Sequence, residues 1–238
     1  MSRSLGVTET LRETLPEWTV PVFEALSLPG ELLVIVPVLG LLYLADVNRS
    51  LRGTDGSLCS DRTAFVIATV FGGLALVVLL KAAFAFPRPP AALHAVTPSE
   101  YGFPSGHAMA ATIMWGAIGW WAMEGRLRKR CSVTGVVIAL VGVSRLALGV
   151  HYLVDVLASV AFGVTYLAVI AWITEGRPGR AFVVAIGIAA GAVLVSDGSG
   201  RSLLAFAGTV SAGIGWWVLE QPTVRRRLIR VIGRGQST

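Results

Sequence analysis

Six ionisable residues lie within or beside the apolar segments of this sequence, where charged side chains are rare. They are Lys81, Arg88, His107, Arg145, His151 and Asp155. Ionisable groups are costly inside a membrane and usually mark a functional site. Three cations and two imidazoles suit the displacement of a phosphate ester, which passes through a state with negative charge on three equatorial oxygens. The set therefore predicts a site that binds and transfers phosphate.

The predicted phosphate-binding residues come from three separate stretches of the chain. Arginine presents a planar charged fork to phosphate oxygens, and lysine presents a compact charge. Ser105 and Gly106 open an apolar segment, where the free N–H groups of a helix N-terminus favour an anion. Each feature alone has an ordinary explanation, such as a lysine that anchors a helix end at the interface. We expect Lys81, Arg88, Ser105, Gly106 and Arg145 to bind phosphate together.

Two histidines and an aspartate are the candidate catalytic groups. His151 and Asp155 are four residues apart, so they share one face of a helix. The carboxylate can then hold one imidazole nitrogen protonated and aim the other, although a purely structural hydrogen bond explains such a pair about as often. His107 falls on the first turn of another expected helix, from which it could protonate a departing alkoxide.

The composition identifies the kind of element that must position these residues. Of the 238 residues, 54% are hydrophobic and 14% are charged, whereas soluble domains carry about 25% charged residues. Such a chain cannot cover a surface that faces water on all sides. The sequence therefore predicts an all-α fold, a polytopic bundle of transmembrane helices.

Apolar runs and breaks predict about seven spans, with six as the alternative because several runs are shorter than the roughly 20 residues that a bilayer requires. The runs cover residues 32–45, 63–86, 107–123, 133–148, 151–173, 181–195 and 203–219. Gly149 is expected to join the fourth and fifth spans in a tight hairpin. We divide the chain into an N-terminal interfacial segment (1–30), a transmembrane phosphatase domain (31–219) and a basic cytoplasmic tail (220–238).

The distribution of Lys and Arg predicts the orientation in the cell membrane. Most of them follow the first, third, fifth and last spans, and this side is cytoplasmic by the positive-inside rule. The N-terminus and the six ionisable residues are then extracytoplasmic, and the C-terminus is cytoplasmic. The net charge of +6 reflects these membrane-flanking cations, so we expect no nucleic-acid partner.

Neither cysteine chemistry nor a metal centre is indicated. Cys59 and Cys131 are too few for a disulfide framework, and the sequence holds no cluster of Cys and His with metal-ligand spacing. We therefore expect no metal and no cofactor. The oligomeric state is left open.

Three motifs resemble the signature of the type 2 phosphatidic acid phosphatase family. They are Lys81-x6-Arg88-Pro89, Pro104-Ser105-Gly106-His107 and Ser144-Arg145-x5-His151-x3-Asp155. The same superfamily includes bacterial undecaprenyl-pyrophosphate and phosphatidylglycerophosphate phosphatases and the vanadium haloperoxidases. The resemblance implies that His151 attacks phosphorus, that Asp155 orients it and that His107 protonates the leaving group. It also implies a metal-independent reaction.

The expected function is hydrolysis of the terminal phosphate of a lipid phosphate or polyprenyl diphosphate, through a phosphohistidine, at the non-cytoplasmic face. The partners would be that lipid and the bilayer. An alternative is a phosphatase or phosphotransferase that acts on soluble phosphate esters. A lipid transporter or scaffold is the alternative without catalysis.

Overall fold

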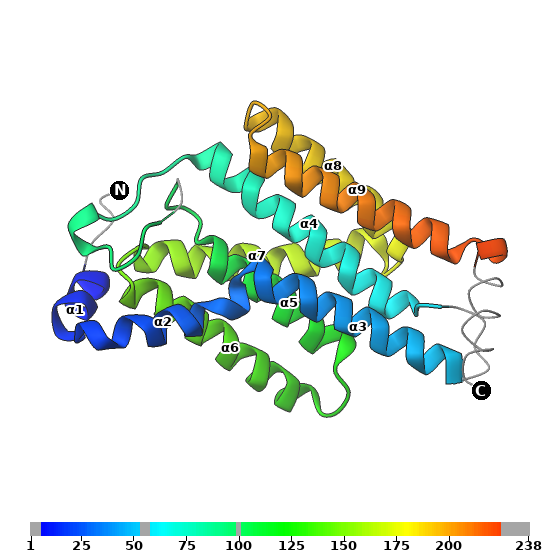
Figure 1. Ribbon diagram of the computed structural model, residues 1–238, viewed down its shortest axis with the longest axis horizontal. Coiled ribbons are helices and arrows are strands. Elements are labelled where there is room, and N and C mark those ends of the chain that lie inside the picture. Colours follow the sequence, from blue (N-terminus) through cyan, green and yellow to red (C-terminus); the bar gives the residue numbers. More distant parts are fainter. Residues whose placement is uncertain (1–5, 53–57, 99–100, 225–238) are drawn as a thin grey trace.

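The computed structural model describes residues 6–52, 58–98 and 101–224, and the regular elements in this part of the chain are all helices. The long helices are α3 (Leu32–Arg52), α4 (Asp61–Phe84), α6 (Leu127–Ala147), α7 (Leu153–Thr174), α8 (Pro178–Val195) and α9 (Gly200–Glu220). All six are long and apolar enough to cross a membrane. They pack side by side in one elongated bundle (Figure 1), which confirms the predicted all-α polytopic fold.

The third predicted span, residues 107–123, differs from the other six. It forms α5 (Gly106–Ala117) and a π-helical turn, η4 (Ile118–Ala122). At 1.5 Å per residue α5 is about 18 Å long, which is shorter than the hydrocarbon core of a bilayer. Eight of its 12 residues are buried, and it packs against α4, α6 and α7. Within the described residues, six helices therefore have spanning length, and α5 is a short central helix among them.

Several helices continue beyond the apolar runs that predicted them. The helix α3 extends past Ala45 to Arg52, and α6 begins at Leu127, so that it includes most of the basic cluster at 126–130. Hydrophobicity marks where a segment can face lipid, whereas charged residues such as Arg and Lys also favour helix and can extend it into water.

Small residues allow the central helices to pack closely. A Cβ atom added to Gly72 of α4 would lie 2.9 Å from the Cβ of Ala185 in α8. Eleven of the 24 residues of α4 are buried between its neighbours, which explains why it is apolar all round rather than on one face. By contrast, Leu33 and Leu41 on α3 are exposed, as expected for a helix that faces lipid.

The N-terminal segment forms two short helices, α1 (Gly6–Thr14) and α2 (Val20–Ser27), with 3-10 turns after each. Neither helix is long enough to cross a membrane. Both pack against α6, and α1 lies at the end of the bundle opposite the C-terminal end of α9 (Figure 1). Whether this segment lies at a membrane interface stays a prediction. Of the basic tail, residues 225–238 lie outside the described residues.

The predicted hairpin between α6 and α7 turns at Gly149. This residue has a φ of +74°, in the left-handed region that glycine adopts without steric cost. A Cβ atom here would lie 1.9 Å from the carbonyl oxygen of Leu93. The loop after α4 thus packs directly on the hairpin, where Ala95 N–H also donates to the Leu148 carbonyl at 3.1 Å.

Replacing Gly149 should therefore destabilise the protein. We expect Gly149→Ala to lower the free energy of unfolding by about 2 kcal/mol or more, because it combines a left-handed conformation with a backbone clash. Gly187→Ala is a matched control, since a Cβ atom there meets no atom within 4 Å. Thermal unfolding of both variants in one detergent tests this; equal melting temperatures would contradict the assignment.

Candidate active site

The structure brings all eight predicted site residues to one end of the bundle. They come from the C-terminal end of α4 and the loop after it, the N-terminal end of α5, the last turn of α6, the turn that follows it and the first turn of α7. Backbone contacts link these elements. Ser105 N–H donates to the Asp155 carbonyl at 3.4 Å, and the Ser159 hydroxyl donates to the Ser105 carbonyl at 3.0 Å. The start of α5 is therefore fixed against α7.

His151 and Asp155 form a buried pair. The Nδ1 of His151 lies 3.5 Å from Oδ2 of Asp155, and both side chains are at most 1% exposed. We predicted that both residues lie on one face of a helix. The structure differs for His151, because α7 begins at Leu153 and His151 lies in the turn before it. Asp155 also caps that helix, since its Oδ2 accepts a hydrogen bond from Tyr152 N–H at 3.0 Å. The carboxylate is thus held behind the imidazole.

Arg88 lies on the other side of the same imidazole ring. Its Nη1 donates to the Val150 carbonyl at 2.8 Å and lies 3.2 Å from Nε2 of His151. Because an arginine nitrogen can only donate, Nε2 is the accepting nitrogen and Nδ1 carries the proton. Burial, and after it the charge of Arg88, lowers the pKa of His151 well below its ordinary value. At neutral pH this imidazole is uncharged and has a lone pair at Nε2.

Lys81 and the start of α5 form a second part of the site. Lys81 Nζ donates to the Tyr101 carbonyl at 2.8 Å. A Cβ atom on Gly106 would lie 3.1 Å from Cε of Lys81, so glycine leaves room for the lysine to pass the first turn of α5. Ser105 precedes this helix, and its buried hydroxyl makes no hydrogen bond within the described residues.

A cleft of about 550 Å³ opens beside these groups. Arg88, His107 and Arg145 line it together with Glu24 and Glu31. Arg145 is buried, and its Nε has no hydrogen-bond partner in the part of the chain that the structure describes. The cleft therefore joins two predicted phosphate-binding arginines to the predicted general acid.

Contacts from residues that precede α3 were not predicted from the sequence. Nε2 of His107 lies 3.2 Å from Oε1 of Glu31, and the hydroxyl of Thr8 donates to the His151 carbonyl at 2.9 Å. Both residues are far from their partners along the chain, and no local motif contains them. The one sequence signal is the position of Glu31 directly before the first apolar run.

Arg201 is a further cation that no motif indicated. It begins α9 and acts electrostatically on both Lys81 and Arg88. Burial and the charge of Arg201 lower the pKa of Arg88 to about 10, while the charge of Asp155 opposes this change. Arg88 therefore stays charged at neutral pH, within a strongly positive environment that favours an anionic ligand.

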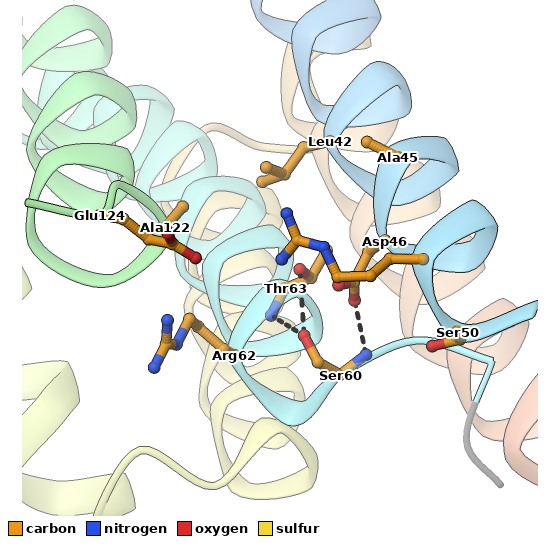
Figure 2. A pocket seen from close by; sticks show the side chains of 10 residues that line it. Leu42, Ala45, Asp46, Ser50, Ser60, Arg62, Thr63, Ala122 and Glu124 are labelled. Carbon is orange, nitrogen blue, oxygen red and sulfur yellow. Dashed lines mark hydrogen bonds between the residues drawn. The ribbon is translucent and has the colours of Figure 1, made fainter. Parts of the chain in front are cut away.

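A second cleft, of about 450 Å³, lies near the start of α4, at the opposite end of that helix from Lys81. Figure 2 shows Asp46 of α3 beside Ser60, whose N–H donates to the carboxylate at 2.6 Å. The Ser60 hydroxyl in turn accepts a hydrogen bond from Thr63 N–H and caps α4. These contacts join two helices and have no paired base and acid, so we assign the chemistry to the first cleft.

Comparisons with known proteins agree with this geometry. A family model described as the PAP2 superfamily matches residues 62–178, which contain all eight predicted site residues. Phosphatidylglycerophosphatase B of Bacillus subtilis (strain 168) is 35% identical over 71 residues, or 27% of this chain and 35% of that protein. The match thus spans about a third of the length of this curated relative.

A solved structure has a similar fold. It is the crystal structure of a transmembrane PAP2-type phosphatidylglycerolphosphate phosphatase from Bacillus subtilis. It aligns with a TM-score of 0.60 over 72% of this chain and 84% of that one, at 22% identity. The family model and the shared fold confirm the resemblance that the three motifs predicted: this chain is a multi-pass membrane protein like the type 2 phosphatidic acid phosphatases.

Proposed function

We propose that this protein hydrolyses the terminal phosphate of a lipid phosphate or polyprenyl diphosphate through a phosphohistidine intermediate. The observation that supports this most directly is the placement of His151 between Asp155 and Arg88. One nitrogen of the ring faces a carboxylate and the other faces a phosphate-binding cation. This is the arrangement that a histidine nucleophile requires.

In the first step, Nε2 of His151 attacks phosphorus. The bond from phosphorus to the leaving oxygen breaks as the phosphorus–nitrogen bond forms, and His107 gives its proton to that oxygen. Asp155 stabilises the positive charge that develops on the ring of His151. Lys81, Arg88 and Arg145, with Ser105 and the Gly106 N–H, bind the three equatorial oxygens.

In the second step, water attacks the phosphohistidine. His107, now neutral, accepts a proton from that water, and the phosphorus–nitrogen bond breaks to release phosphate and restore His151. Both steps use groups that belong to the protein. Metal independence is part of the proposal, and chelation tests it.

A lipid substrate at the extracytoplasmic face fits the position of the site. The site lies at the ends of apolar helices, where an acyl or prenyl chain could remain in the bilayer while its phosphate enters the cleft. Phosphatidic acid, phosphoglycerol lipids and prenyl diphosphates share this chemistry. The division into an interfacial segment (1–30), a phosphatase domain (31–219) and a basic cytoplasmic tail (220–238) belongs to the same proposal.

Two alternatives make different demands on the site. A phosphatase or phosphotransferase for soluble esters would act equally well on substrates without an apolar tail. A lipid transporter or scaffold would not need a buried nucleophile, its orienting carboxylate and an acid in one cleft. The convergence of these groups favours the enzyme.

Phosphate release tests the central proposal. We expect the purified protein, in detergent with EDTA, to release phosphate from a panel of lipid phosphates and diphosphates. His151→Ala should lower this rate by about 1,000-fold or more, because it removes the nucleophile. A folded wild-type protein that is inactive on every substrate, or an equally active His151→Ala, would exclude the mechanism.

The pH dependence tests the role of Arg88. Because the pKa of His151 is lowered, its neutral, attacking form persists to acidic pH. Arg88→Gln removes a nearby positive charge, so the pKa should rise and the acid limb of kcat/KM should move to higher pH. At pH 7.5 kcat/KM should also fall about 100-fold, because a phosphate contact is lost.

Arg180→Gln is the matched control for this experiment. Arg180 is exposed, pairs with Glu175 and lies at the start of α8, away from the site. Its removal should change neither the rate nor the pH profile. A profile for Arg88→Gln with an unchanged acid limb would argue against the assigned contact with His151.

Cysteine labelling tests the orientation. In intact cells, a membrane-impermeant maleimide should react with Ala92→Cys, which lies in the loop beside the site, in a background that carries Cys131→Ser. The wild-type protein should stay unlabelled, because Cys131 is exposed but lies near the opposite end of α6. Burial raises the pKa of Cys59 to about 12 and keeps that thiol unreactive. The reverse labelling pattern would place the site in the cytoplasm.

A further inference from the structure

We propose that Glu31 is a positioning residue for the general acid: from outside the family's motifs it orients His107 and stabilises its protonated form. This inference rests on the proposed phosphatase reaction. It adds a second histidine–carboxylate pair to the site: Glu31 with His107, alongside Asp155 with His151. Glu31 lies outside residues 62–178, the segment that the family model matches.

The backbone around Glu31 is well fixed. The residue has an extended conformation between the turn η2 (Leu28–Gly30) and α3. Its N–H donates to the Leu28 carbonyl at 2.9 Å, and its carbonyl accepts from Val34 N–H and Ile35 N–H at 3.0 and 2.9 Å. Glu31 is thus the residue on which α3 begins, so its side chain starts from a defined point.

The two residues before Glu31 hold this point against α5. Gly30 packs on the backbone of His107, because a Cβ atom there would lie 2.4 Å from the His107 carbonyl oxygen. The indole N–H of Trp115 donates to the Pro29 carbonyl at 3.0 Å. Residues 29, 30 and 31 therefore all contact α5, and the 3.2 Å approach of Oε1 to Nε2 of His107 is part of a continuous interface.

The charges around His107 explain why an acid at this position needs a carboxylate. Burial, and after it the charges of Arg145 and Lys81, lower the pKa of His107 to about 4, because a buried site and nearby cations both disfavour the charged imidazolium. Glu31 is the negative group that opposes them. With Nε2–H bound to Glu31, the proton on Nδ1 is the one delivered to the leaving oxygen.

A merely structural role for Glu31 predicts a different outcome. A structural contact would tether the N-terminal segment, and a neutral amide could preserve it by hydrogen bonding to the same nitrogen. Glu31→Gln therefore keeps the shape and the hydrogen-bonding capacity but removes the charge. Glu24→Gln is the matched control, because Glu24 lines the same cleft and also carries a negative charge.

The experiment compares two phosphate monoesters that carry the same long alkyl tail. One releases an alkyl alcohol, whose oxygen must be protonated as it leaves, and the other releases a nitrophenol, which needs no acid. We expect Glu31→Gln to lower kcat about 10- to 100-fold on the alkyl ester and less than about 3-fold on the nitrophenyl ester. The alkaline limb of the pH profile should also move to lower pH, since the imidazolium loses its counter-charge. Glu24→Gln should change both esters by the same factor.

The possible results separate this inference from the proposed function. If the wild type is active and depends on His151, but folded Glu31→Gln loses activity equally on both esters or on neither, Glu31 is not a positioning residue and the phosphatase assignment stands. An inactive wild type would overturn both. Thermal unfolding of each variant in the same detergent shows whether it is folded.

Discussion

The arrangement of this protein depends on one constraint, which is that charges buried in an apolar bundle must be compensated. Asp155 is completely buried, and an isolated carboxylate in such surroundings is strongly disfavoured. It is stabilised because it caps α7 and faces His151. His151 in turn contacts Arg88, and the loop that carries Arg88 packs on the hairpin turn at Gly149. These contacts tie the loop after α4, the hairpin turn and the start of α7 into one arrangement.

The helical bundle and the central group of site residues could be predicted from the sequence. Runs of apolar residues are long enough to show where most helices lie. The site residues could be grouped because they belong to three motifs, which lie near the ends of α4, α5, α6 and α7. The exact helix ends could not be predicted. Asp46, for example, lies in α3 just after the predicted end of the first span, and Lys129 lies in α6 before the predicted start of the fourth. Helix formation and lipid exposure are separate properties, and hydropathy reports the second.

The contributions of the N-terminal segment could not be predicted either. Thr8 and Glu31 reach the two histidines across separations of 143 and 76 residues. No periodicity or spacing encodes such contacts, because they depend on how α1 and α2 fold back over α6 and how the turn η2 packs on α5. Arg201 was missed for the same reason, since only packing brings the start of α9 near Lys81. Motifs therefore indicate the proposed reacting groups but not the groups that surround them.

The packing of Pro29, Gly30 and Glu31 on α5 has a consequence for how this protein could be divided or recombined. A fragment bounded by the motifs would hold every signature residue, yet it would leave the backbone of His107 and the indole of Trp115 without the surface that covers them. A chimera that joins this catalytic core to the leading segment of a relative would need a matching Pro-Gly-Glu junction. The smallest unit that can be exchanged as a module is therefore larger than the signature by which the protein is recognised.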